Sequence, residues 1–176
     1  MADHAADGEI FIYMGGRAPQ RVTRVRIDKS VKEIEERAFW NNRRLLEVQM
    51  HDGITKVGKL AFNNCQSMRA INLLGVKVVE DEAFYGCRSI SDLVGDKLET
   101  IGGSAFEQCT SLMYLTIPSG RIIDVGAFPE CIALTGAELP EGLETGEDAF
   151  FGTSLRRIVI PLKDDMIEDN VFEDCA

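Results

Sequence analysis

The chain has 176 residues, is 45% hydrophobic and 27% charged, and carries a formal net charge of −10. This is the composition of one globular domain with a sizeable core. No apolar run approaches the roughly 20 residues that a membrane-spanning helix needs, and no basic face is available for a nucleic-acid backbone. Membrane insertion and nucleic-acid binding are therefore not expected.

The first predicted element is EIFIYMGG (9–16), which has the composition of a strand. The preceding residues, MADHAADG, contain neither the basic region nor the apolar stretch of a secretory signal. We expect residues 1–21 to form an N-terminal tail with a strand-like segment that covers the first repeat. The repeat domain then spans residues 22–176.

A unit of 22 or 23 residues repeats along nearly the whole of this domain. Its clearest marker is a phenylalanine after a small or branched residue, here called the Phe column: Phe39, Phe62, Phe84, Phe106, Phe128, Phe150 and Phe172. Three residues later comes the Cys column, which holds all five cysteines: Asn42, Cys65, Cys87, Cys109, Cys131, Thr153 and Cys175. Such a unit cannot bury its own apolar face, so like units must stack into a solenoid.

Within each unit we expect one strand, a second short extended segment and a tight turn. The strand follows the Cys column with an L-x-x-L-x-L-like pattern, as in LMYLTI (112–117), which alternates like a half-buried strand. The segment KLETIG (97–102) is extended, and A-F-x-x-C is short enough for a 3₁₀ turn. Thr145 in an apolar position and a one-residue shortening after Phe150 predict the least regular coils between residues 120 and 155.

The pattern C-x-x-L-x-x-L-x-I-P followed by V-x-x-I-G-x-x-A-F-x-x-C resembles the BspA-type leucine-rich repeat over about residues 22–175. The resemblance implies a β-rich α/β solenoid of right-handed coils, with a parallel sheet on one face and short 3₁₀ or helical turns on the other. About seven coils are expected, the seventh incomplete. It also implies a binding or adhesion module, in some members at the cell surface.

The five cysteines are interpreted as small buried core residues. A catalytic cysteine needs a base beside it, but the two histidines, His4 and His51, belong to no repeat position. The 22-residue spacing is unlike the paired ligands of a zinc site. Disulfides or a metal remain the alternative, since stacked cysteines about 5 Å apart are close enough to pair. We expect neither an enzyme nor a cofactor.

The surface predicted to bind is the outward side of the strands. Its residues are chemically mixed, with Met113 and Tyr114 adjacent near the middle and several arginines around them, side chains that are enriched at interfaces. The candidate partner-binding residues are Arg24, Arg26, Glu47, Arg69, Asp92, Met113, Tyr114, Arg156 and Arg157. A protein or peptide is the predicted partner of this non-enzymatic interaction or scaffolding module. The alternative is a structural or adhesive segment of a larger cell-surface protein.

Charge is distributed unevenly along the chain. Residues 1–60 carry +2 and residues 138–176 carry −8. Stacked coils turn this into an axial gradient, which predicts head-to-tail self-association. The absent signal and the odd number of cysteines predict a cytoplasmic location, and a surface location if the chain is a fragment.

Overall fold

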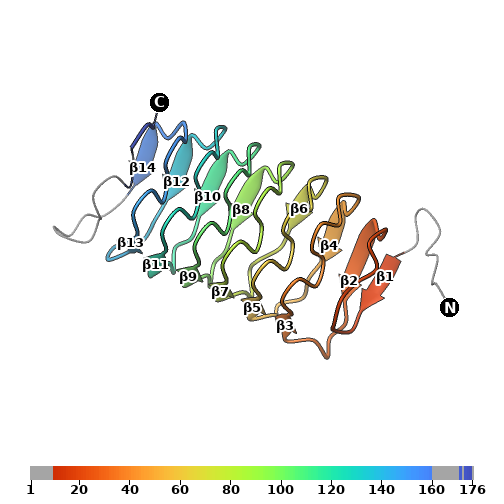
Figure 1. The fold of residues 1–176 in the computed structure, drawn as a ribbon. Helices are drawn as coiled ribbons and strands as arrows, with labels where there is room; N and C mark the ends of the chain where they lie inside the picture. The colour runs from red at the N-terminus through yellow and green to blue at the C-terminus, as the bar shows by residue number, and fades with distance from the viewer. Residues whose placement is uncertain (1–9, 160–170, 172, 176) are drawn as a thin grey trace.

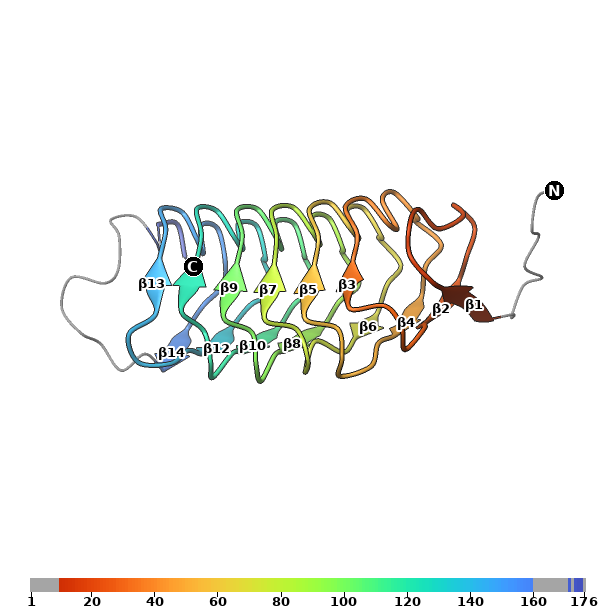
Figure 2. The same ribbon diagram turned by 90° about the horizontal axis from the view of Figure 1, so that it is seen from below.

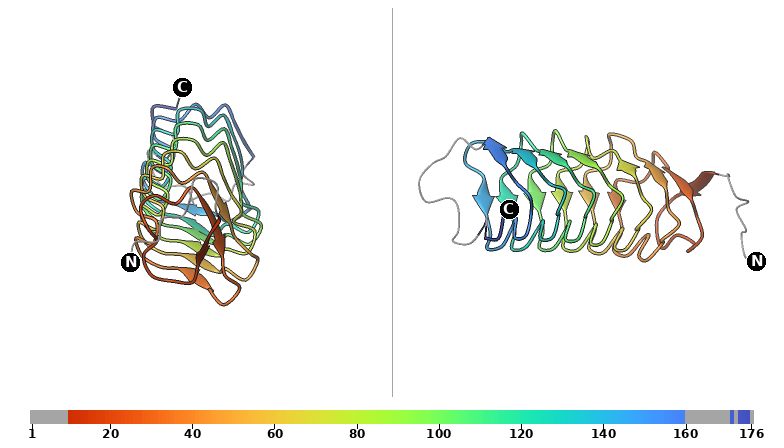
Figure 3. Two further views of the ribbon diagram at one scale, coloured as in Figure 1. Left: turned by 90° about the vertical axis from the view of Figure 1, so that its right-hand side faces the viewer. Right: turned by 90° about the horizontal axis from the view of Figure 1, so that it is seen from above.

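In the computed structural model, which describes residues 10–159, 171 and 173–175, the chain winds into a parallel β-solenoid (Figure 1). Successive coils contribute strands of two to four residues to a front face and strands of two residues to a back sheet, and a turn region joins the two (Figure 2). Seen end-on, the coils superpose closely (Figure 3). The predicted solenoid is confirmed, with about six turns in the described chain.

The front face is made of two four-stranded parallel sheets. The first has the order β1-β2-β4-β6: β1 (Ile10–Tyr13), β2 (Arg24–Ile27), β4 (Glu47–Gln49) and β6 (Ala70–Ile71). The second has the order β14-β12-β10-β8: β8 (Asp92–Val94), β10 (Tyr114–Thr116), β12 (Gly136–Glu138) and β14 (Arg157–Val159). In β4, β8 and β10 the central residue is buried between more exposed ones, as in β10, where Leu115 is buried and Tyr114 exposed.

The back sheet is continuous over six coils, in the order β13-β11-β9-β7-β5-β3. Its strands are two residues long: β3 (Glu33–Ile34), β5 (Lys56–Val57), β7 (Val78–Val79), β9 (Thr100–Ile101), β11 (Ile122–Ile123) and β13 (Glu144–Thr145). The second residue of each strand is buried, including Thr145. The predicted irregularity between residues 120 and 155 is wrong, because β11 pairs in register with β9 and with β13.

The interruption lies instead on the front face, between β6 and β8. The Asn72 side chain accepts a hydrogen bond from the Leu74 backbone N–H (2.9 Å), which turns the chain directly after Ile71 and ends β6 early. In the next coil Gly95 stands where neighbouring coils place the buried side chains of Leu73 and Ile117. β6 is therefore short, and the segment after β8 lacks a buried side chain, so these two strands do not pair.

Buried aromatic rings run along the solenoid axis. Phe39, Phe62, Phe84, Phe106, Phe128 and Phe150 are each at most 1% exposed, and neighbouring rings stack with centroids 5.0–5.3 Å apart. Tyr13 extends this row at the N-terminal end, 4.9 Å from Phe39. The periodic phenylalanine is thus the structural centre of each coil, because offset aromatic stacking adds to the burial of apolar area.

The turn region around this column is built from successive tight turns and contains no helix in the described part of the chain. Backbone N–H groups donate to the carbonyl three residues earlier, as from Cys65 to Phe62 (3.0 Å). Two residues before and after each phenylalanine the backbone adopts positive φ, for example 59° at both Leu60 and Asn64. These left-handed residues stop a 3₁₀ helix from propagating, and they turn N–H groups toward the next coil, as from Asn64 to Tyr85 O (2.7 Å).

Candidate functional site

All nine predicted binding residues lie on the front face or directly beside its strands. The seam between β6 and β8 divides them into two groups. Arg24, Arg26, Glu47 and Arg69 accompany the first sheet, and Asp92, Met113, Tyr114, Arg156 and Arg157 accompany the second. The face is therefore two adjoining surfaces and not one uniform ladder.

On the first sheet the polar side chains form a connected series. Arg24 lies directly opposite Glu47 in the strand register. Arg26 Nε donates to Gln49 Oε1 (3.2 Å), and Gln49 Nε2 donates to Glu47 Oε1 (2.9 Å). These bonds fix two of the predicted residues, and Gln49 joins them although it is not among the nine.

A shallow hollow of about 380 Å³ opens beside this series, at the edge next to the seam. Its lining includes Val48 and Ile71 beneath Glu47, Gln49 and Asn72. Ile71 is only partly buried, unlike the corresponding Leu93 and Leu115. The early end of β6 explains this exposure, and no feature of the sequence pattern predicts it.

On the second sheet the centre is apolar. Val94 is 45% exposed, Met113 51% and Tyr114 41%. Tyr114 lies opposite Asp92 on one side and opposite Gly136 on the other. A Cβ atom placed on Gly136 would come within 2.4 Å of Tyr114 Cε2, so the tyrosine ring lies across the glycine. Glycine at position 136 therefore sets the orientation of Tyr114.

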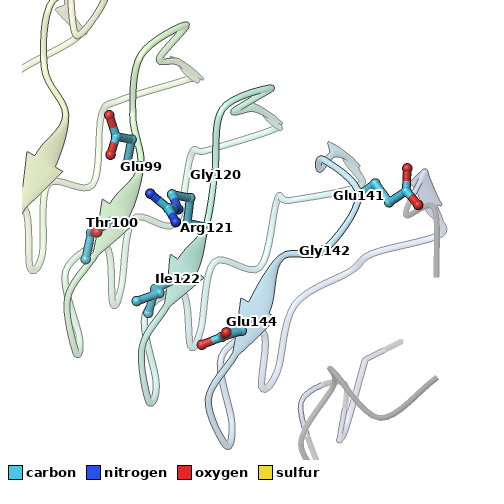
Figure 4. Close-up of a pocket in the computed structure, with 8 residues that line it drawn as sticks. All are labelled: Glu99, Thr100, Gly120, Arg121, Ile122, Glu141, Gly142 and Glu144. Carbon is cyan, nitrogen blue, oxygen red and sulfur yellow. The ribbon is translucent and has the colours of Figure 1, made fainter. Parts of the chain in front are cut away.

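A second hollow, of about 370 Å³, lies along the back sheet near β9, β11 and β13 (Figure 4). The small Gly120 and Gly142 leave the space, and Arg121 extends between Glu99 and Glu144 (Figure 4). Glu99 also forms an ion pair with Lys77 (3.3 Å). No group of three or more metal-ligating side chains that could hold a metal ion occurs among the described residues.

The cysteines have a common structural role. Cys65, Cys87, Cys109 and Cys131 are fully buried, Cys175 is partly buried, and all five are free. Each thiol donates to the backbone carbonyl of a Phe-column residue in the preceding coil, at 3.1–3.3 Å. The burial predicted for the column is confirmed, whereas this bond to the phenylalanine carbonyl was not predicted.

Burial suppresses the reactivity of four of these thiols, those of Cys65, Cys87, Cys109 and Cys131. It raises the pKa of Cys65 and of Cys131 to about 12, and it raises the pKa of Cys87 and Cys109 well above 9.0. The thiolate is the reactive form of cysteine, so a raised pKa suppresses nucleophilic chemistry. His51 offers no base, because its Nε2 lies 3.1 Å from Asp28 O and its Nδ1 accepts from Gly53 N–H (3.1 Å).

The fold and the exposed mixed face together define a leucine-rich-repeat solenoid. The family model for the BspA type leucine rich repeat region, present in six copies, matches residues 18–120 and 74–176. The chain therefore belongs to the BspA-type leucine-rich repeat family. No curated protein matches it.

Three solved structures of bacterial proteins have a similar fold. A leucine rich cell surface protein from Faecalibacterium prausnitzii matches with a TM-score of 0.71 and 27% identity, over 83% of this chain and 41% of that one. A leucine-rich repeat protein from Bacteroides ovatus matches with a TM-score of 0.65 and 28% identity, over 80% of this chain and 43% of that one. A leucine rich repeat protein of T. pallidum shares the fold, with a TM-score of 0.60 and 21% identity over 79% of this chain and 78% of that one. The chain spans less than half the length of the Faecalibacterium protein and less than half the length of the Bacteroides protein.

These comparisons overturn the predicted cytoplasmic location, since the similar protein from Faecalibacterium prausnitzii is a cell surface protein. The prediction relied on the odd number of cysteines and on the absence of a signal-like segment at the start of the sequence. Here their burial and hydrogen bonds give the thiols a packing role that does not depend on the compartment. In the described residues no helix has the length and apolarity to cross a membrane.

Proposed function

We propose that this chain is a non-enzymatic repeat segment of a larger cell-surface protein and that it binds a protein partner through its front face. The similarity to the Faecalibacterium surface protein, of which this chain covers 41%, supports the location and the larger parent. The four buried thiols and the hydrogen-bonded His51 support the absence of catalysis, which requires an activated nucleophile or base.

The exposed apolar centre of the second front sheet carries the binding proposal. Val94, Met113 and Tyr114 are at least 41% exposed on consecutive coils. Arg156 and Arg157, both exposed, follow two coils further on. Tyrosine, methionine and arginine are enriched at protein interfaces, and a few such residues contribute most of the binding energy.

A bead-adhesion assay tests the binding site. Beads coated with the protein are incubated with intact cells of the source organism and with host-type epithelial cells, and bound beads are counted. The double variant Met113→Ala/Tyr114→Ala should lose most of the adhesion that the wild type shows. Ile122→Ala is the matched control, since Ile122 is equally exposed (43%) but lies on the back sheet.

Gly136→Ala provides an independent test of the same site. The new methyl group must displace the Tyr114 ring, while all nine candidate side chains keep their chemistry. Reduced adhesion is expected. Equal adhesion by the wild type and by both front-face variants would exclude this face as the binding site.

The location is tested separately by brief protease treatment of intact source cells. Peptides from the repeat should appear in the supernatant before any cytoplasmic marker does. Release only after lysis would refute the surface location without bearing on the front face.

A further inference from the structure

The first strand of the front face has an edge that no strand of the described chain covers. β1 pairs with β2 on one side and is the terminal strand of its sheet (Figure 1). Its sequence, Ile10-Phe11-Ile12-Tyr13 followed by Met14, contains no charged residue and no proline. Natural edge strands are normally protected by such residues or by being very short, since an unprotected edge pairs with other strands.

The terminal strands of the back sheet show that protection. β3 and β13 are two residues long, whereas β1 has four. Glu33 in β3 has Lys32 and Glu35 beside it, and Glu144 in β13 has Glu147 nearby. Among these three terminal strands, β1 alone is longer than two residues and contains no charged residue.

The geometry of β1 directs hydrogen-bonding groups outward. The Tyr13 carbonyl accepts from Asp28 N–H (2.9 Å), so Tyr13 faces β2 with its backbone groups. Alternate residues of a strand point their N–H and C=O groups to opposite sides. The backbone groups of Ile10 and Ile12 therefore face the open edge. Their side chains lie on the outer surface, where Ile12 is 44% exposed and the following Met14 72%.

The sequence of this edge is symmetric about Ile12. Positions 10, 12 and 14 are aliphatic or thioether side chains, and positions 11 and 13 are aromatic. In an antiparallel pair with Ile12 at the centre, each residue faces one of its own kind. Such self-complementarity is what an isologous two-fold interface requires.

We propose that β1 pairs edge to edge and antiparallel with β1 of a second copy of this chain, with Ile12 on the two-fold axis. Each Ile12 N–H donates to the Ile12 carbonyl of the other copy, and Ile10 lies opposite Met14. Phe11 lies opposite Tyr13 on the inner side. The two first sheets then form one continuous eight-stranded sheet. The nearest arginines, on the two β2 strands, are three strand spacings or about 14 Å apart, so salt screens their repulsion.

This contact differs from the head-to-tail association predicted from the charge gradient. That prediction depends on six acidic residues near the C-terminal end of the chain, of which Glu173 and Asp174 are described and Asp164, Asp165, Glu168 and Asp169 lie outside the described residues. Head-to-tail pairing of opposite charges weakens as salt rises, whereas backbone pairing of apolar strands does not.

Sedimentation velocity on the intact chain, from about 1 to 300 µM and at low and high salt, tests the proposal. The wild type should shift reversibly from monomer to dimer at both salt concentrations, without larger species. Ile12→Lys puts two like charges together at the axis and should stay monomeric. Ile122→Lys is the matched control, equally exposed (43%) but on the back sheet and away from this edge, and should dimerise like the wild type.

Amide hydrogen exchange locates the contact. The Ile12 amide should exchange more slowly as protein concentration rises, while the Phe11 amide, which faces β2, should not change. A monomer throughout the range, a dimer that survives Ile12→Lys, or concentration-independent exchange at Ile12 would each overturn the proposal.

Discussion

Alkaline pH should destabilise this protein through its buried cysteines. Burial raises the folded pKa of Cys65 and Cys131 from 9.0 to about 12, and that of Cys87 and Cys109 well above 9.0. Between about pH 9 and pH 12 these thiols therefore hold more protons in the folded chain than in the unfolded chain. The stability that the thiols contribute is complete below pH 9 and is lost as the pH rises toward 12.

The size of the loss at pH 10 depends only on the unfolded chain. There the thiolate outweighs the thiol about tenfold, which lowers the free energy of the unfolded state by about 1.4 kcal/mol per thiol. The buried thiols stay protonated because pH 10 is still well below their folded pKa. Cys65 and Cys131 together should account for about 3 kcal/mol, a large part of the stability of an ordinary domain.

Urea denaturation under reducing conditions, at pH 7 and pH 10, measures this loss. The matched variant is Cys65→Ser/Cys131→Ser, whose hydroxyl groups do not titrate in this range. The variant should be less stable than the wild type at pH 7. Its free energy of unfolding should also fall between pH 7 and pH 10, but by about 3 kcal/mol less than that of the wild type. All other titrating groups are the same in both proteins. An equal fall in the two would show that these thiols are not buried as described.

Three further outcomes are expected. A thiol reagent at pH 8 should modify Cys175 first and the four buried thiols only through unfolding, and rapid reaction of four or more would contradict their burial. Phe106→Ala should lower the free energy of unfolding by about 4–5 kcal/mol, because it leaves a cavity and removes two stacked contacts. A loss of stability no larger than that caused by Ile122→Ala, at an exposed position, would refute the stabilising role of the stacked phenylalanine rings. Glu130→Gly should raise the free energy of unfolding by about 0.5–1 kcal/mol, since φ is 58° at position 130. Gly86→Val should lower the stability of the protein, since the new Cβ would lie 2.9 Å from Asn64 Oδ1. Thermal melts in which Gly86→Val is the more stable of these two variants would refute the left-handed turns.

The repeat period was enough to predict the coil, because it records which side chains must lie above one another. A phenylalanine every 22 or 23 residues has a single arrangement that buries every ring, and the stacked row follows from it. The same register brought the cysteines into one buried column. It also put the nine candidate residues on one face, since strand alternation fixes which side chains point outward.

The departures from the prediction come from interactions that a residue pattern does not encode. The seam depends on one side-chain bond from Asn72 and on the missing side chain of Gly95. The positive φ values at Leu60 and Glu82 are imposed by hydrogen bonding to the next coil, against the preference of these residues. The Gly136 contact with Tyr114 is visible only once β10 and β12 are in register.

The distribution of ion pairs indicates which face is free to evolve a binding site. Three ion pairs between coils lie on or beside the back sheet: Lys56 with Glu80, Lys59 with Asp81 and Lys77 with Glu99. Those charges help to hold the coils together, so changing them costs some stability. On the front face the coils are already joined by backbone ladders and by buried residues such as Leu115. Exposed residues such as Tyr114 and Arg156 are therefore not needed to hold the coils together, and these positions can be selected for contacts with a partner.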